Sequence, residues 1–327
     1  MSESLHLALG HNRLSIIDLS EHAAQPMRSR DGRYLLVYNG EIYNYREIAQ
    51  ELGKADLPDE DFGDTAVVVA ALARWGPAAL SKFNGMWALL FYDTQEKTLL
   101  VSRDRFGIKP LYFYSNGVES IFASEIKAIL AARPSRFSVN PDVAIPYLTR
   151  GLLNVSNQTM LSGITAFPPA SYQVINLRHG PDPMAPRKYW LHPFEAGEAP
   201  VPGRITPEEL RALFLDSVRL RLRSDVPVGV LLSGGVDSSS IVGGVAAAGE
   251  LGNLTVLSVT SDDRSSNEEG FIDMMARYVN TVPQKVNVSD NPRGLLERVT
   301  EACWFSDQPI CSLSDIAYLK LIELARS

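Results

Sequence analysis

The first half of the chain alternates short apolar runs with turn-forming residues, a pattern that predicts β-strands. Asn-Gly pairs favour tight hairpins, so we expect turns at 39–40, 84–85 and 116–117. Every position of 86–91 is apolar, which predicts a strand covered on both faces by other layers. The expected strands are 34–38, 86–92, 98–102, 111–114 and 121–123.

Two helical segments interrupt these strands. The first, 45–52, follows Asn44 as N-cap and stops at Gly53. The second, 64–75, is expected to start with Asp64 as its cap and to stop at Gly76. The first half is therefore predicted to be a layered α/β domain.

A proline-rich stretch, 167–203, separates the two halves, and its second part, 191–204, is interpreted as an interdomain linker. This places one domain at 1–190 and another at 205–327. Length agrees, because 327 residues exceed what one hydrophobic core usually organises.

Beyond the linker, strands and helices alternate. Thr206, Pro207 and Glu209 have the spacing of a capping box with proline at the first helical position. Alternation of this kind predicts a parallel α/β sheet. The expected elements are strands at 228–232 and 254–260 and helices at 238–248 and 268–279.

Composition excludes several classes of protein. The formal charge of −7 offers no basic surface for nucleic acid. No apolar run is long enough for a membrane span, and the first residues do not form a signal peptide, so a cytoplasmic location is expected. Cys303 and Cys311 suggest neither a disulfide framework nor a zinc site.

The sharpest motif lies at 230–239, where an apolar strand runs through Ser-Gly-Gly-Val-Asp-Ser into a helix. Glycine N–H groups and a helix N-terminus favour a bound phosphate. Asp237 suits a Mg²⁺ that bridges to phosphate oxygens, whereas no Walker A lysine follows the glycines. The loop resembles that of ATP pyrophosphatases, which cleave ATP to AMP and pyrophosphate. A bare Ser-Gly-Gly would fit a simple turn with a serine cap.

An ordered set of further motifs precedes this loop. Together they are similar to glutamine-hydrolysing asparagine synthetases over nearly the whole chain. The motifs are GHNRLSIID at 10–18, QPM at 25–27, YNGEIYN at 38–44, FNGMWA at 83–88, RDRFGIKPLY at 103–112 and SEIKA at 124–128.

The resemblance implies an N-terminal glutaminase with the four-layer α/β/β/α fold of N-terminal nucleophile hydrolases, followed by a parallel-sheet α/β domain. Glutamine would be hydrolysed in the first domain, and its ammonia would pass to the second. There ATP and aspartate would form β-aspartyl-AMP, which ammonia converts to asparagine. The implied cofactors are ATP and Mg²⁺, and the implied assembly is a homodimer.

The resemblance also assigns roles to residues of the glutaminase half. The Asn39 side chain and the Gly40 N–H would stabilise the oxyanion, while Arg13 would bind the glutamine carboxylate. Glu41 and Asp64 would contact its α-amino group, although the family's Ser-Asp-Thr-Glu reads Gly-Asp-Thr-Ala at 63–66. Taken alone, Asn39-Gly40 would fit a hairpin turn and Arg13 a surface arginine.

In the second half, the resemblance places adenine between Leu232 and Val259, at the ends of two parallel strands. Asp237 would also hold the metal. The remaining ATP-binding residues are expected to be Ser233, Gly234, Gly235 and Ser238.

Two family segments have no match in this sequence. The nucleophile segment Met-Cys-Gly-Ile-x-Gly is one, and Ser2 does not replace its cysteine because the spacing to Arg13 differs. The second ATP loop, Ser-Gly-x-Gly-x-Asp-Glu, is the other. We therefore expect an incomplete chain that does not hydrolyse glutamine. Alternatives are a non-catalytic nucleotide-binding remnant, a β-lactam synthetase type, or an enzyme that amidates another carboxylate.

Overall fold

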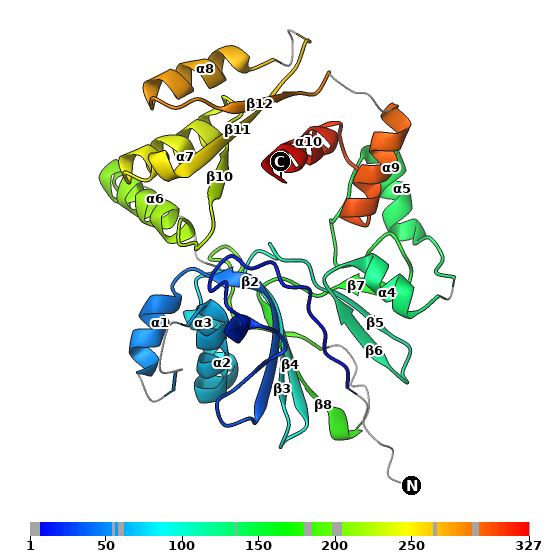
Figure 1. Cartoon of the computed structure of the whole chain (residues 1–327). Coiled ribbons are helices and arrows are strands. Elements are labelled where there is room, and N and C mark those ends of the chain that lie inside the picture. Colours follow the sequence, from blue (N-terminus) through cyan, green and yellow to red (C-terminus); the bar gives the residue numbers. More distant parts are fainter. Residues whose placement is uncertain are drawn as a thin grey trace. The chain divides into compact units, whose positions relative to one another are not determined.

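The chain forms two compact units, Met1–Pro200 and Val201–Ser327, which are described separately (Figure 1). The structure is a computed structural model, and Ser2 and residues 198–204 of the expected linker lie outside its described part. The described residues are 7–53, 56–57, 62–134, 136–179, 185–197, 205–263, 267–289 and 294–326.

A mixed-length antiparallel sheet of order β1-β2-β3-β4-β8-β9 forms the centre of the first unit. Its two longest strands, β2 and β3, pair along their whole length, with Tyr38 opposite Leu89. The strands are β1 (Met27–Arg28), β2 (Tyr34–Ile42), β3 (Gly85–Asp93), β4 (Thr98–Arg103), β8 (Ser171–Asn176) and β9 (Arg187–Lys188).

Both faces of this sheet are covered, as the wholly apolar run at 86–91 predicts. Successive side chains of a strand point to opposite faces. Trp87 and Leu89 join the core beneath helices α1 (Tyr45–Leu52) and α2 (Asp64–Trp75), which lie on one side of the sheet (Figure 1). Ala88 joins a second core on the opposite face.

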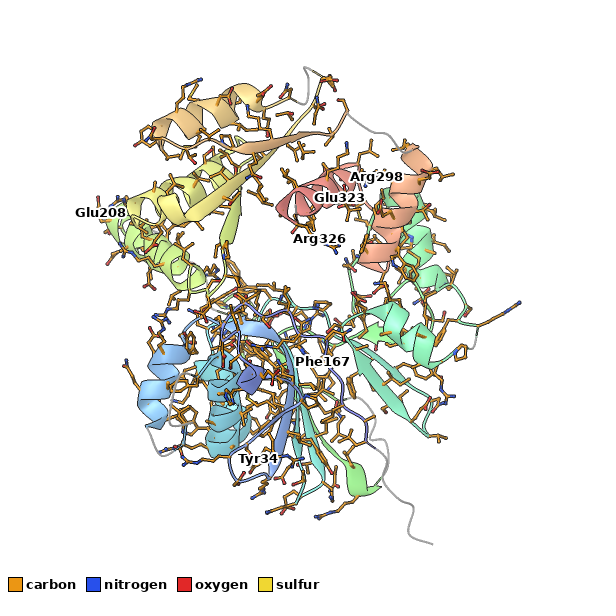
Figure 2. All side chains as sticks on the ribbon, in the orientation of Figure 1. Tyr34, Phe167, Glu208, Arg298, Glu323 and Arg326 are labelled. Carbon is orange, nitrogen blue, oxygen red and sulfur yellow. The ribbon has the colours of Figure 1, made fainter. Side chains whose placement is uncertain are left out.

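A second sheet, of order β6-β5-β7, packs over that opposite face. Phe167 is fully buried in the core between the two sheets (Figure 2). Ile126 and Ile129 of helix α4 pack on the outer face of the second sheet. The expected α/β/β/α layering is thereby confirmed. The elements are β5 (Tyr112–Ser115), β6 (Ser120–Ala123), β7 (Ile164–Ala166), α3 (Ala79–Lys82), α4 (Ile126–Ala132) and α5 (Pro141–Arg150).

Two of the three predicted Asn-Gly turns are wrong. β2 continues through Asn39 and Gly40, and Gly85 is already the first residue of β3. Glycine is needed here for space: a Cβ on Gly40 would lie 2.2 Å from the Met86 carbonyl oxygen, and one on Gly85 would lie 2.1 Å from the Glu41 oxygen. The turn at 116–117 is confirmed between β5 and β6.

The start of α2 also differs from the expectation. Its N-cap is Gly63, and Asp64 is the first helical residue without a capping hydrogen bond from its side chain. The carboxylate instead accepts hydrogen bonds from the Tyr38 hydroxyl and the Ile42 N–H of β2.

The second unit contains a parallel sheet of order β10-β11-β12, as predicted. Thr206 and Glu209 form the expected capping box at the start of helix α6, whose first residue is Pro207. The elements are β10 (Val228–Leu231), β11 (Leu254–Thr260), β12 (Gln284–Asn287), α6 (Pro207–Arg221), α7 (Val236–Ala247), α8 (Glu269–Tyr278), α9 (Leu295–Ser306) and α10 (Ser314–Arg326).

Helices α7 and α8 share one core with the ends of β10 and β11, built around Leu232, Val242 and Ile272. Farther along the chain, Arg298 of α9 and Glu323 of α10 form an ion pair at 2.8 Å (Figure 2). Within the described ranges, no helix combines the length and apolar character that crossing a bilayer requires.

Candidate functional site

The first candidate site follows the edge of β2 that faces away from β3. The Tyr43 N–H, one residue past β2, donates to Asn84 on the β3 side at 2.8 Å. Even-numbered residues therefore point the other way, since backbone groups alternate along a strand. The Tyr38 N–H donates to the Gln25 Oε1 at 2.6 Å, and the Ile42 N–H donates to the Asp64 Oδ2 at 3.0 Å.

Gly40 lies between these two residues and shares their direction, so its N–H points to the same open edge. Its neighbour Asn39 is half-buried, and the Asn39 Nδ2 donates to the Ser124 Oγ at 3.3 Å. Two hydrogen-bond donors, a backbone N–H and a side-chain amide, thus belong to adjacent residues of β2. Preorganised donors of this kind are what a developing oxyanion requires.

Two carboxylates accompany these donors. Asp64 is buried, and burial raises its pKa against the hydrogen bonds it accepts from Ile42 and the Tyr38 hydroxyl. Burial and the Asp64 charge raise the pKa of Glu41, while the Lys109 ammonium lowers it. Glu41 and Asp64 are therefore electrostatically coupled, which gives the site a negative side.

Arg13 uses its guanidinium to hold a loop in this structure. It donates to the backbone oxygens of Ser20 at 2.8 Å, Ile17 at 3.4 Å and Asp18. The predicted carboxylate partner is therefore half-buried and bonded to carbonyls. Its charge also lowers the pKa of His11, two residues earlier in the chain.

Sequence reasoning missed three residues of this site. Burial lowers the pKa of His11, as does the Arg13 charge, while the hydrogen bond to Tyr38 raises it. Gln25 bonds both backbone groups of Tyr38, and Ser124 accepts from Asn39. The available signal was their position inside three of the ordered motifs, at 10–18, 25–27 and 124–128.

The second candidate site is the loop between β10 and α7. Gly234 has φ +88°, a left-handed conformation, and its Cα faces α8 so closely that a Cβ would lie 2.9 Å from the Phe271 Cβ. The hydroxyls of Ser233 and Ser238 lie 3.0 Å apart, and the Ser233 N–H donates to the Ser238 Oγ at 3.1 Å. Gly235 caps α7, so the loop ends at a helix N-terminus.

The predicted adenine neighbours occupy the carboxyl ends of adjacent parallel strands. Leu232 is buried directly after β10, and Val259 is the penultimate residue of β11. Ser258, which the sequence did not single out, ties the strands together by donating from its Oγ to the Leu232 oxygen at 2.7 Å. Ligands of open α/β sheets bind at this end of the strands.

Asp237 is exposed in the first turn of α7, beside the phosphate loop. No group of three or more His, Cys, Asp or Glu side chains in the described part of the chain could hold a metal by itself. Mg²⁺ usually takes one or two carboxylates, waters and substrate phosphates. One carboxylate beside a phosphate loop fits that pattern.

Family models match both parts of the chain. Residues 1–190 match the glutamine amidotransferase domain and residues 209–327 match asparagine synthase. Among solved structures, the glutamine phosphoribosylpyrophosphate amidotransferase of Bacillus subtilis matches at a TM-score of 0.38 and 17% identity, over 85% of this chain and 66% of that one.

Curated relatives match across almost the whole chain. The first is "Putative asparagine synthetase (glutamine-hydrolyzing) 2" of Methanocaldococcus jannaschii, 32% identical over 98% of this chain and 63% of the relative. Amidase chry2 of Gibberella zeae is 32% identical over 98% and 49%, respectively. Asparagine synthetase (glutamine-hydrolyzing) 1 of Bacillus subtilis is 31% identical over 98% and 48%.

The chain thus spans 63% of the first relative and about half of the other two. The two family models follow each other in the same order as the two candidate sites, one per unit. The chain belongs to the glutamine-hydrolysing asparagine synthetase family, whose members join a glutamine amidotransferase domain to an asparagine synthase domain.

Proposed function

We propose that this protein takes part in the ATP-dependent amidation of aspartate, with glutamine as the nitrogen donor and asparagine as the product. The proposal assigns glutamine to a domain at 1–190 and ATP to a domain at 205–327, joined by a linker at 191–204. The observation that carries it is the position of Asn39 and Gly40 on β2, where the Gly40 N–H lies on the edge away from β3 and the Asn39 amide donates to Ser124.

At the first site, attack on the glutamine amide would place negative charge on its oxygen. The Gly40 N–H and the Asn39 Nδ2 would donate to that oxygen and lower the barrier. Glu41 and Asp64 supply the negative side that an α-ammonium group needs, and Arg13 supplies a cation for the α-carboxylate. Arg13 would exchange a loop carbonyl for the substrate when glutamine binds.

At the second site, the aspartate β-carboxylate would attack the α-phosphorus of ATP, and the bond to the pyrophosphate oxygen would break. Ammonia would then displace AMP from the resulting acyl adenylate. Ser233, Gly234, Gly235 and Ser238 would surround the pyrophosphate, with Leu232 and Val259 beside the adenine. Asp237 would hold a Mg²⁺ that neutralises phosphate charge.

A glutaminase assay tests the first site. In a chain completed with the family's nucleophile segment, replacing Asn39 with alanine should lower the rate of glutamine hydrolysis by roughly 10²–10³-fold, the usual loss for one oxyanion donor. Ser120→Ala, at an exposed position of the same unit, is the matched control. Equal rates for wild type and Asn39→Ala would contradict the assigned role.

Labelled ATP tests the second site. In a chain completed with the second ATP loop, aspartate-dependent release of AMP and pyrophosphate is expected, and release of ADP and phosphate would remove the adenylation proposal.

A second function is favoured by the relatives that are named amidases rather than synthetases, chry2 and chyE. They match this chain about as well as the synthetases do, so the acceptor carboxylate could belong to a different molecule. Pyrophosphate exchange into ATP, measured with aspartate and with other carboxylic acids, identifies the acceptor. Exchange with another acid and none with aspartate would favour this second function.

Cytoplasmic location and a homodimeric assembly complete the proposal. The homodimer comes from the family resemblance, and the location is the expectation drawn from the sequence. Light scattering on the purified protein measures the mass of the assembly, and a mass equal to one 36.0 kDa chain would exclude the dimer.

A further inference from the structure

The side chain of Gln25 continues the backbone ladder of the large sheet. β1 pairs with β2 through Met27 opposite Leu36, and the same register places residue 25 opposite Tyr38. At that position the Gln25 amide makes both ladder bonds itself: its Oε1 accepts from the Tyr38 N–H at 2.6 Å, and its Nε2 donates to the Tyr38 oxygen at 3.0 Å. The primary amide of a side chain thus replaces a strand residue.

This replacement lies next to the proposed oxyanion donors. Tyr38 precedes Asn39, and Gly40 is the next residue whose N–H points to the same edge. The direction of the Gly40 N–H is set by the backbone on either side of it, which pairs with β3 along one edge. Asp64 holds the following outward amide, that of Ile42, and Gln25 holds the preceding one.

We propose that Gln25 is a positioning residue, which orients the Gly40 N–H and the Asn39 amide toward the glutamine oxygen without touching the substrate. The inference rests on the proposed glutaminase site. It predicts that Gln25 needs both an acceptor and a donor, because its amide bonds both backbone groups of Tyr38.

Two substitutions separate these requirements. Gln25→Met keeps the length of the side chain and removes both hydrogen bonds. Gln25→Glu keeps the acceptor but, when ionised, presents an oxygen to the Tyr38 carbonyl oxygen; protonation restores a donor. Gln173→Met is the matched control, since Gln173 is buried and accepts from the Ala185 N–H in another part of the unit.

The Gly40 amide can be observed directly by NMR in the whole chain. Labelling asparagine with ¹³C at the carbonyl and glycine with ¹⁵N selects only the Asn-Gly pairs, whose amides are those of Gly40, Gly85 and Gly117. Gly117 lies in the β5–β6 turn and serves as an internal reference. We expect Gln25→Met to shift the Gly40 signal, and Gln173→Met to leave it in place.

In Gln25→Glu, the Gly40 signal should return toward its wild-type position as the pH falls. His11, Arg13, Glu41 and Asp64 also lie around this edge, so the comparison is made with wild type at each pH to cancel their titration. A Gly40 signal that moves equally in Gln25→Met and Gln173→Met would overturn the proposal, as would a Gln25→Glu signal without this return.

Calorimetry with L-glutamine separates this inference from the function on which it rests. Gln25→Met should raise the Kd by roughly tenfold, the scale of one net hydrogen bond, while Gln173→Met leaves it unchanged. Glutamine binding that Asn39→Ala weakens and Gln25→Met does not would overturn the positioning role alone. No binding by wild type would overturn the glutamine site, while the NMR signals would still decide whether Gln25 orients Gly40.

Discussion

Individual side chains at the β2 edge hydrogen-bond groups of the protein itself, including its backbone. The Asp64 carboxylate illustrates this: its Oδ2 accepts from the Ile42 N–H and from the Tyr38 hydroxyl, so it is buried with hydrogen bonds already made. Burial still raises its pKa. An ionised Asp64 therefore lowers the stability of the folded protein, and a bound cationic group would offset that loss.

This cost predicts a pH dependence for Asp64→Asn. The folded pKa lies above the ordinary value of 3.8, so the folded state binds the proton more tightly and wild type loses stability as the pH rises through that range. The stability advantage of wild type over the variant should shrink from about pH 4 upward. Urea unfolding of both proteins between pH 4 and 7 measures it.

Asp93→Asn provides a control of opposite sign. Burial alone would raise the pKa of Asp93, but hydrogen bonds from Arg33 and from the backbone at 95 and 96 lower it overall. Its contribution is present above the ordinary value and is lost at lower pH, so this variant's deficit should stay level above about pH 4. An Asp64→Asn deficit that grows with pH would contradict the assigned cause.

At the scale of elements, the close approach of β2 and β3 determines which residues fit at positions 40 and 85. We predict that Gly85→Ala is destabilising by about 1–3 kcal/mol, because the new methyl group would meet backbone atoms of Glu41 and Ile42 that cannot rotate away. Gly10→Ala is the control, since a Cβ there meets nothing within 4 Å. Denaturant unfolding compares the two, and equal midpoints would show that the strands separate easily.

The same elements show how far the sequence could lead. Apolar alternation and caps predicted the bounds of α1 and β11 and the presence of a capping box at Thr206, because those signals are local. Asn39-Gly40 and Asn84-Gly85 were misassigned because the pair has two uses, positive φ in a turn and space between strands. Only the partner strand distinguishes these uses.

The candidate site was predictable to a similar degree. Motif order identified residues that the fold brings to the β2 edge, Asn39 and Gly40 among them. The supporting contacts of Gln25 and Ser124 could not be predicted, because they depend on register and on a second sheet. Long-range pairing of this kind leaves no local pattern in the sequence.

At the scale of the whole molecule, each unit has its own core and its own candidate site. We predict that Asp237→Asn weakens the binding of Mg-pyrophosphate by roughly tenfold, because one charge-assisted metal ligand is lost, while glutamine binding is unchanged. Asn39→Ala should weaken the binding of glutamine and leave the binding of Mg-pyrophosphate unchanged. Calorimetry with both ligands measures this.

Asp216→Asn is the matched control for that experiment, since Asp216 is also exposed and lies on α6 of the same unit. Without Mg²⁺, wild type, Asp237→Asn and Asp216→Asn should bind pyrophosphate with the same affinity. If Asp237→Asn changed glutamine affinity, or changed metal-free and metal-dependent binding alike, the metal role would be contradicted.

The two edge strands of the parallel sheet differ in charge, which affects how readily the protein associates in solution. Along β12, Lys285 forms ion pairs with Glu269 and Asp273. Among the strands that the structure describes, β10 is the other border and reads Val-Gly-Val-Leu, with Leu231 40% exposed and no charged side chain. An uncharged border strand offers its peptide groups to another molecule. Concentrated solutions should therefore form oligomers through β10, and a lysine in place of Gly229 should improve colloidal stability.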